Sequence, residues 1–194
     1  MKLSEKKALK KKEEIILSAV KIMNRKGYHG ATMEDIAAEL LMTKGALYYY
    51  FRNKEDIIFK CHELVLTRAI EELETYLYED STNEEKLRKM IYTHIDYAIG
   101  EKETFNMISK PDHTFSKEQL KPILSKRIAY ASVFDRVIQQ GIESKEFTVD
   151  EPKFVRMILL GAMNWIQQWY NAEGGKSIEE LQKIYADYLL KVVK

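Results

Sequence analysis

Apolar residues recur every three or four positions along nearly all of this 194-residue chain, and that spacing places them on one face of a helix. No stretch alternates apolar and polar residues over the length of a strand, and no Asn-Gly pair marks a hairpin. The pattern predicts an all-α fold of about nine helices. We expect them at residues 13–26, 33–40, 44–51, 54–78, 83–100, 103–109, 117–144, 151–171 and 177–193.

Composition narrows the class of protein. Hydrophobic residues make up 45% of the chain and charged residues 31%, as in ordinary globular proteins. The single cysteine, Cys61, cannot form an internal disulfide. Charges interrupt the N-terminal residues, so no signal peptide is expected, and the most apolar stretch, residues 157–163, is too short to cross a bilayer. We therefore expect a cytoplasmic protein that does not associate with membranes.

Positive charge is concentrated near the N-terminus. Residues 1–60 contain 13 Lys or Arg and 8 Asp or Glu, a net charge of +5, although the whole chain carries only +1. A local excess of this kind attracts phosphate over a screening length of roughly 10 Å. An ordinary solvated surface explains the same distribution. The lysines of residues 6–12, interleaved with glutamates, leave a contact with a DNA backbone and a solvated helix face equally open.

Two short helices at 33–40 and 44–51, separated by a three-residue turn, have the dimensions of a helix-turn-helix, whose second helix lies in the major groove of DNA. Thr32 and Thr43 precede them in the N-cap position. An apolar seam is expected to hold the pair together, formed by Ile36, Ala37, Leu40, Leu47 and Phe51.

The opposite face of the second short helix is expected to contact DNA. It presents Lys44, Gly45, Tyr48 and Tyr49. These residue types suit DNA contact, because glycine permits close approach of the backbone and phenol hydroxyls donate to phosphates. Tyr50 is expected to face the core. Lys54 begins the next helix, where its charge opposes the helix dipole unless a phosphate lies nearby; an exposed lysine without a partner is the alternative.

The segments 31–39 (ATMEDIAAE) and 43–56 (TKGALYYYFRNKED) resemble the N-terminal signature of TetR-family regulators, over roughly residues 12–60. The resemblance implies a homodimer with a three-helix head, residues 1–52, and a ligand-binding and dimerisation body, residues 53–194. It also implies DNA contacts at Thr32, Thr43, Lys44, Tyr48, Tyr49 and Lys54. Leu41 departs from the family pattern, which commonly has glycine at this turn. A left-handed backbone there costs a non-glycine residue about 1 kcal/mol.

The two C-terminal helices are expected to pair with those of a second subunit. Residues 154–170 are apolar on almost every side, which is typical of a helix buried on both faces. The last helix carries a narrower stripe: Ile178, Leu181, Ile184, Tyr185, Tyr188, Leu189 and Val192. A four-helix dimer bundle buries both; a core formed within one chain is the alternative.

Segments 143–152 (ESKEFTVDEP) and 161–171 (GAMNWIQQWYN) resemble the C-terminal region of TetR-type regulators of fatty-acid degradation, over roughly residues 125–193. This resemblance implies a small hydrophobic effector, such as an acyl-CoA, whose binding releases a palindromic DNA operator. The candidate ligand-binding residues are Tyr92, Phe105, Met107, Arg127, Tyr130, Phe134, Met163 and Trp165, with Lys126 beside Arg127 as a further phosphate contact. For any single one of the apolar residues, simple core packing is the alternative.

Catalysis is not expected. The four histidines, His29, His62, His94 and His113, are scattered, and the sequence contains no glycine-rich phosphate loop or paired metal-ligand motif. We therefore expect no enzymatic activity, no metal and no cofactor. The alternative to a ligand-responsive repressor is a DNA-binding dimer that is controlled by a protein partner.

Overall fold

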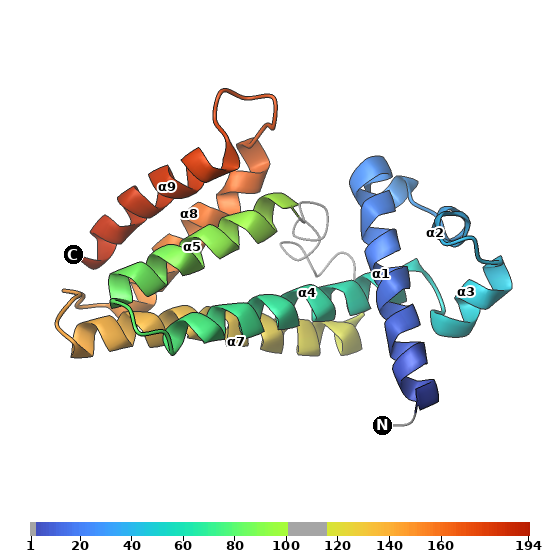
Figure 1. The fold of residues 1–194 in the computed structure, drawn as a ribbon, viewed down its shortest axis with the longest axis horizontal. Coiled ribbons are helices and arrows are strands. Elements are labelled where there is room, and N and C mark those ends of the chain that lie inside the picture. The colour runs from blue at the N-terminus through green and yellow to red at the C-terminus, as the bar shows by residue number, and fades with distance from the viewer. Residues whose placement is uncertain (1–2, 101–115) are drawn as a thin grey trace. The chain divides into compact units, whose positions relative to one another are not determined.

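The computed structural model describes residues 3–100 and 116–194, and within them it contains eight α-helices and no strand, which confirms the predicted all-α fold. The helices are α1 (Leu3–Gly30), α2 (Met33–Glu39), α3 (Lys44–Tyr50), α4 (Lys54–Leu77), α5 (Asn83–Gly100), α7 (Lys117–Glu143), α8 (Pro152–Trp169) and α9 (Ile178–Leu189), followed by the 3-10 helix η2 (Leu190–Val193) (Figure 1). Most bounds agree with the predicted ones. The start of α1 does not, because the helix begins ten residues before residue 13. The helix predicted at residues 103–109 lies outside the described residues.

The first compact unit, Met1–Val65 with Glu101–Ile123, contains the helix-turn-helix. Its core forms between α1, α2, α3 and the start of α4, where Ile22, Ile36, Leu47 and Ile57 are completely buried. The predicted seam is confirmed: Ile36, Ala37, Leu47 and Phe51 are buried, and Leu40 packs against them. Packing in this core therefore fixes which face of α3 remains exposed.

Local backbone signals explain where the helices of this unit end. Gly27 has a φ of 71°, a left-handed conformation that interrupts α1 one residue after the predicted end. At the end of α2, the Met42 amide donates to the Ala37 carbonyl (2.9 Å) and the Leu41 amide to the Ala38 carbonyl (3.1 Å). This is the Schellman pattern. Leu41 occupies the left-handed position of this motif with a φ of 51°, so the turn keeps the geometry for which glycine is common.

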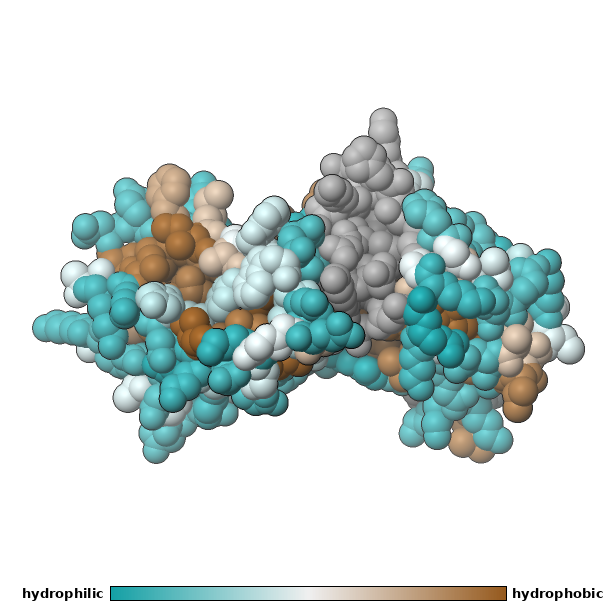
Figure 2. Space-filling model, turned by 90° about the horizontal axis from the view of Figure 1, so that it is seen from above, coloured by the Kyte–Doolittle hydropathy of each residue, from teal (hydrophilic) through white to brown (hydrophobic). Residues whose placement is uncertain are grey.

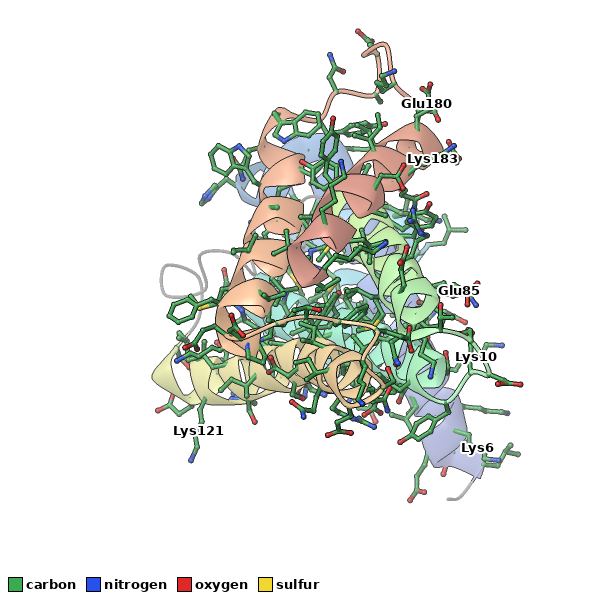
Figure 3. All side chains as sticks on the ribbon, turned by 90° about the vertical axis from the view of Figure 1, so that its left-hand side faces the viewer. Lys6, Lys10, Glu85, Lys121, Glu180 and Lys183 are labelled. Atoms are coloured by element: carbon green, nitrogen blue, oxygen red, sulfur yellow. The ribbon has the colours of Figure 1, made fainter. Side chains whose placement is uncertain are left out.

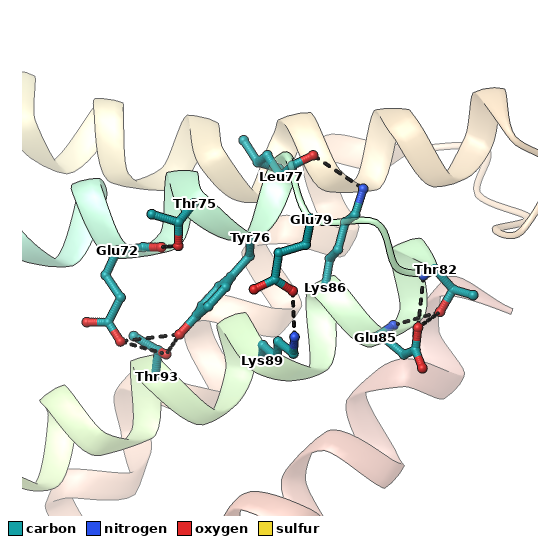
Figure 4. A network of polar contacts seen from close by, with 10 residues as sticks. All are labelled: Glu72, Thr75, Tyr76, Leu77, Glu79, Thr82, Glu85, Lys86, Lys89 and Thr93. Atoms are coloured by element: carbon teal, nitrogen blue, oxygen red, sulfur yellow. Dashed lines mark hydrogen bonds and ion pairs between the residues drawn. The ribbon is translucent and has the colours of Figure 1, made fainter.

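The second compact unit consists of Leu66–Gly100 and Leu124–Lys194. Within it, α5 packs against both α8 and α9. Figure 4 shows the polar contacts that fix the link between α4 and α5. The Thr82 hydroxyl accepts from the Glu85 amide (3.2 Å), and Lys86 donates to the Leu77 carbonyl (3.3 Å). These contacts fix the short link in which α5 begins after α4.

A second non-glycine residue with a left-handed backbone follows the end of α7. Lys145 has a φ of 64°, and the Glu146 amide donates to the Gly141 carbonyl (2.9 Å). Phe147 then folds back over Gly141, so closely that a Cβ at that position would lie 2.1 Å from the phenyl ring. Glycine is required there because of space, and the packing fixes the connection from α7 to α8.

No helix among the described residues combines the length and the apolar character needed to cross a bilayer.

Candidate functional site

The outer face of α3 is the candidate nucleic-acid surface. Lys44, Gly45, Tyr48 and Tyr49 are exposed there, and the Tyr49 side chain is 84% exposed. Tyr50 packs partly against the core, as predicted. The structure thus brings the four predicted α3 residues together on one accessible surface.

The two predicted threonines cap helices, and their hydroxyls differ in availability. Thr32 accepts from the Asp35 amide (3.1 Å) and donates its own hydroxyl proton to the Asp35 carboxylate (2.8 Å). Thr43 accepts from the Ala46 amide (3.2 Å). Among the described residues, no acceptor takes the Thr43 hydroxyl proton. Thr43 can therefore donate to a phosphate without losing its capping bond, whereas Thr32 must first release Asp35.

Asp35 also joins α1 to α2. Its carboxylate forms an ion pair with Lys26 (2.7 Å). The hydrogen bond from Lys26, followed by those from Thr32, lowers the pKa of Asp35 to about 2. The Asp35 carboxylate of this capping box is therefore fully ionised at neutral pH, and the box holds the start of α2 in place.

Lys44 is held by an acidic neighbour. Its ammonium pairs with Glu34 of α2 and lies 5.9 Å from the centre of the Tyr48 ring. The hydrogen bond to Glu34 raises the pKa of Lys44 and lowers that of Glu34. Lys44 is thus positioned on the surface of the helix pair, and a phosphate would compete with Glu34 for it.

Gly45 has no structural reason to be glycine within this chain. A Cβ built at this position meets no atom within 4 Å, and the backbone is not left-handed. Glycine nevertheless weakens a helix relative to alanine. Close approach of DNA to the backbone would explain a glycine here, and this contact remains a prediction.

Lys54 has an internal partner. Its ammonium donates to the Ala31 carbonyl (2.8 Å), in the link between α1 and α2, and the residue is partly buried. The bond ties the start of α4 to the head and offsets the unfavourable position of a lysine at a helix N-terminus. A phosphate contact at Lys54 remains a prediction.

In the second unit, a partly buried polar cluster joins α5, α7 and α8. His94 of α5 is 2% exposed; its Nδ1 lies 2.8 Å from the Tyr130 hydroxyl of α7, and its Nε2 lies 3.2 Å from Oδ1 of Asn164 of α8. The Phe134 ring packs edge-on against His94, and Met163 is completely buried. Three helices therefore meet at one imidazole in an otherwise apolar layer.

The hydrogen-bond directions in this cluster follow from the chemistry. An amide oxygen only accepts, so His94 Nε2–H donates to Asn164. Burial lowers the pKa of His94 to about 4, although the bond to Asn164 opposes this shift. The imidazole is then neutral, and its Nδ1 accepts the proton of Tyr130, whose own pKa is raised by burial.

The other predicted ligand residues do not all join this cluster. Arg127 lies on the same face of α7 as Tyr130 and Phe134. It precedes Tyr130 by about one turn and Phe134 by about two. Tyr92 lies on another side of α5, where its carbonyl accepts from Gln182 of α9 (3.1 Å). Lys126 donates to Thr67 (2.6 Å). Phe105 and Met107 lie outside the described residues.

Trp165 requires a correction. It was predicted to line a cavity, but its side chain is 65% exposed on the face of α8 opposite Met163. It belongs to an apolar surface stripe that runs along α8 and α9: Phe154, Met157, Ile158, Trp165, Trp169, Ile184 and Tyr188. Hydrophobic residues gather on the surface at the left-hand end of Figure 2, in the part of the molecule that contains these helices. Periodicity could not show which side of so apolar a helix faces its own chain.

His94 and Asn164 were not recognised as site residues from the sequence. The available signal was the position of His94 on the apolar face of α5, between Ile91, Ile95 and Ala98, where an apolar residue is expected. No group of three or more His, Cys, Asp or Glu side chains in the described part of the chain is arranged to hold a metal ion.

A capped helix pair with an exposed second helix, followed by a larger helical unit, defines a helix-turn-helix DNA-binding protein. Residues 15–61 match the model of bacterial regulatory proteins of the tetR family, and residues 80–193 match the tetracyclin repressor-like C-terminal domain. The chain therefore belongs to the TetR family of transcriptional regulators. The matched proteins are regulators and not enzymes, as the sequence predicted.

Individual proteins are similar over most of the chain. The fatty acid metabolism regulator protein of Bacillus subtilis is 26% identical over 78% of each chain. The structure of FadR from Bacillus subtilis in complex with stearoyl-CoA has a TM-score of 0.77 and 23% identity, and the alignment covers 94% of this chain and 99% of that one. AibR in complex with isovaleryl coenzyme A and operator DNA has a TM-score of 0.75 and 21% identity, covering 94% and 97%. At these identities the structural matches establish the fold.

Proposed function

We propose that this regulator is a cytoplasmic repressor that binds a palindromic operator as a homodimer and releases it when an acyl-CoA binds. In this proposal residues 1–52 read DNA, and residues 53–194 carry the effector site and the dimer interface. The exposed face of α3 carries the DNA assignment, because Thr43, Lys44, Gly45, Tyr48 and Tyr49 combine donors, rings and open space on one surface.

Sequencing the DNA fragments that the purified protein selects tests this role. We expect a near-palindrome with half-sites about one helical turn, roughly 34 Å, or somewhat more apart. Tyr49→Ala should change the selected sequence, because its exposed ring has no role in the core. Selection of the same sequence by this variant would remove Tyr49 from base recognition.

The apolar stripe on α8 and α9 supports the homodimer. Leu181 and Leu189 of the predicted seam are buried within the unit, whereas Ile184 and Tyr188 remain exposed beside the stripe residues of α8. A contiguous apolar surface of this kind is typical of a protein interface. A second copy of this stripe would cover it in a symmetric four-helix arrangement.

Charge substitution tests the interface. Trp165→Glu should dissociate the dimer, since an unpaired carboxylate in an apolar interface costs several kcal/mol. Ile128→Glu is the matched control, because the Ile128 side chain is exposed to a similar extent (71% against 65%) but lies on α7. Analytical ultracentrifugation distinguishes the two variants, and a dimeric Trp165→Glu protein would place the interface elsewhere.

Acyl-CoA is proposed as the effector on two grounds. The names of the relatives connect their regulation to fatty acids and CoA esters. In this chain, the cluster of His94, Tyr130 and Asn164 places hydrogen-bonding groups inside an apolar layer, which suits a chain with one polar carbonyl. Ligand binding opposes DNA binding if each favours a different conformation, and the coupling is reciprocal.

Operator affinity should be measured against a chain-length series of acyl-CoAs, with free CoA as control. We expect the longer chains to weaken operator binding, and Tyr130→Phe, which removes only a hydroxyl, to reduce this effect. Unchanged operator affinity across the series would reject the effector and favour the alternative, control by a protein partner.

A further inference from the structure

The N-terminal part of α1 extends beyond the core of the first unit. Ile15 is the first buried residue of the helix, and none of residues 3–14 is buried. We call residues 3–14 the α1 extension. At 1.5 Å per residue it is roughly 18 Å long. Figure 1 shows this end of α1 reaching beyond α3 toward the lower edge of the picture.

The α1 extension contains no buried side chain, and its composition explains why it is helical. It consists almost entirely of residues that favour helices: lysine, glutamate, leucine and alanine. Five of its twelve residues are lysines and three are glutamates. Lys11 pairs with Glu14 (3.1 Å), whereas Lys6 and Lys10 are exposed and form no ion pair with a described residue.

The lysines of this segment are placed unfavourably for an isolated helix. Lys6 and Lys10 are four residues apart, so their charges repel along one face. Lys6, in the first turn of α1, also opposes the helix dipole. A polyanion reverses both effects. Core packing explains nothing about these positions, because the side chains contact no core.

We propose that the α1 extension forms a second DNA contact, in which Lys6 and Lys10 bind phosphates outside the segment read by α3. This inference rests on the proposed operator binding. Charge complementarity favours DNA as the occupant, and the extension belongs to the same compact unit as α3. Figure 3 labels both lysines on the protruding end of the helix. They lie roughly 6 Å apart along its axis, close to two 3.4 Å steps of a DNA strand.

The length of the extension sets the scale of the contact. Roughly 18 Å corresponds to about five base pairs of duplex. The operator should therefore be protected beyond each half-site, and flanking base pairs should contribute affinity whatever their sequence.

The test combines a variant with a trimmed duplex. Lys6→Gln with Lys10→Gln removes two charges per subunit and preserves helix propensity. Affinity is measured over a range of salt concentrations on an operator with long flanks and on one trimmed by about five base pairs at each end. The control, Lys153→Gln with Lys183→Gln, removes equal charge from exposed positions in the second unit. Lys6→Arg with Lys10→Arg keeps both charges and should bind as wild type does.

We expect wild type and control to lose affinity when the flanks are trimmed, and the Gln variant to be insensitive to trimming. Its salt slope on the long duplex should fall by roughly 1.8 to 3.6, the share of two to four phosphates per dimer. Equal slopes and equal sensitivity to trimming in variant and control overturn the proposal. The proposal is also overturned if the Gln variant binds the trimmed duplex more weakly than wild type does. A wild type without specific DNA binding contradicts the proposed function itself, and the inference with it.

Discussion

Replacing Gly45 with alanine should stabilise the protein and weaken its binding to DNA. The free energy of unfolding should rise, because alanine favours a helix over glycine by about 0.8–1.0 kcal/mol in a helix interior. Gly45 is the second residue of α3, where the full difference does not apply, so we expect about 0.5 kcal/mol. No steric cost opposes this gain, since the new Cβ meets no atom within 4 Å.

The loss of DNA affinity has a separate cause. A methyl group on the exposed face of α3 would hold the helix away from base edges and phosphates. A loss of about 1.4 kcal/mol of binding free energy per half-site lowers the affinity tenfold. Two independent half-sites would lower the affinity of a dimer roughly a hundredfold. Stability and affinity should therefore change in opposite directions.

Thermal unfolding and an electrophoretic mobility shift assay measure the two quantities on the same preparations. The melting temperature should rise by about 1–2 °C for a chain of this size. Gly30→Ala is the matched control, because its Cβ makes only an ordinary 3.5 Å contact with Lys26 and lies off α3. Were Gly45→Ala to bind the operator as tightly as wild type, the argument that DNA approaches this glycine closely would be refuted.

Three further predictions concern the stability of the fold. Leu41→Gly should raise the free energy of unfolding in urea by about 1 kcal/mol, because the left-handed Leu41 is 97% exposed and loses little packing; a destabilised variant would show that its side chain matters. Gly141→Ala should lower that free energy by about 1–3 kcal/mol, because its Cβ would lie 2.1 Å from Phe147, and adding Phe147→Leu should recover part of the loss. Finally, the folded-state pKa of His94 is lowered from 6.5 to about 4, so the unfolded chain binds more protons between these values. Stability should fall by roughly 3 kcal/mol as the pH drops through that window, with a flatter profile for His94→Phe.

Helix positions were predictable from the sequence because caps and periodicity agree. Thr32 and Thr43 precede α2 and α3, and both form the expected capping bonds. Gly27 interrupts α1 through its φ of 71°. The early start of α1 was missed because residues 3–12 carry no apolar stripe. They are helical through intrinsic propensity, which periodicity does not detect.

The candidate sites were predictable to different degrees. On α3, the buried Leu47 and Phe51 fix the exposed face, so Tyr48 and Tyr49 could be placed by spacing alone. On α8, apolar residues on nearly every side left the orientation open, and Trp165 was assigned to the wrong face. The pairing of His94 with Tyr130 and Asn164 joins residues 36 and 70 positions apart. Local sequence patterns carry no information about contacts at such separation.

Gly161 extends the reasoning about Gly45 to the second unit. It is exposed within the apolar stripe of α8, three residues after Ile158 and four before Trp165, and its Cβ would also meet no atom within 4 Å. In both helices the chain retains a glycine that weakens the helix and that no internal contact requires. Gly141, by contrast, is required by Phe147. Gly45 and Gly161 lie on the two faces proposed to contact DNA and the second subunit, and close approach of another surface to the backbone would explain both glycines.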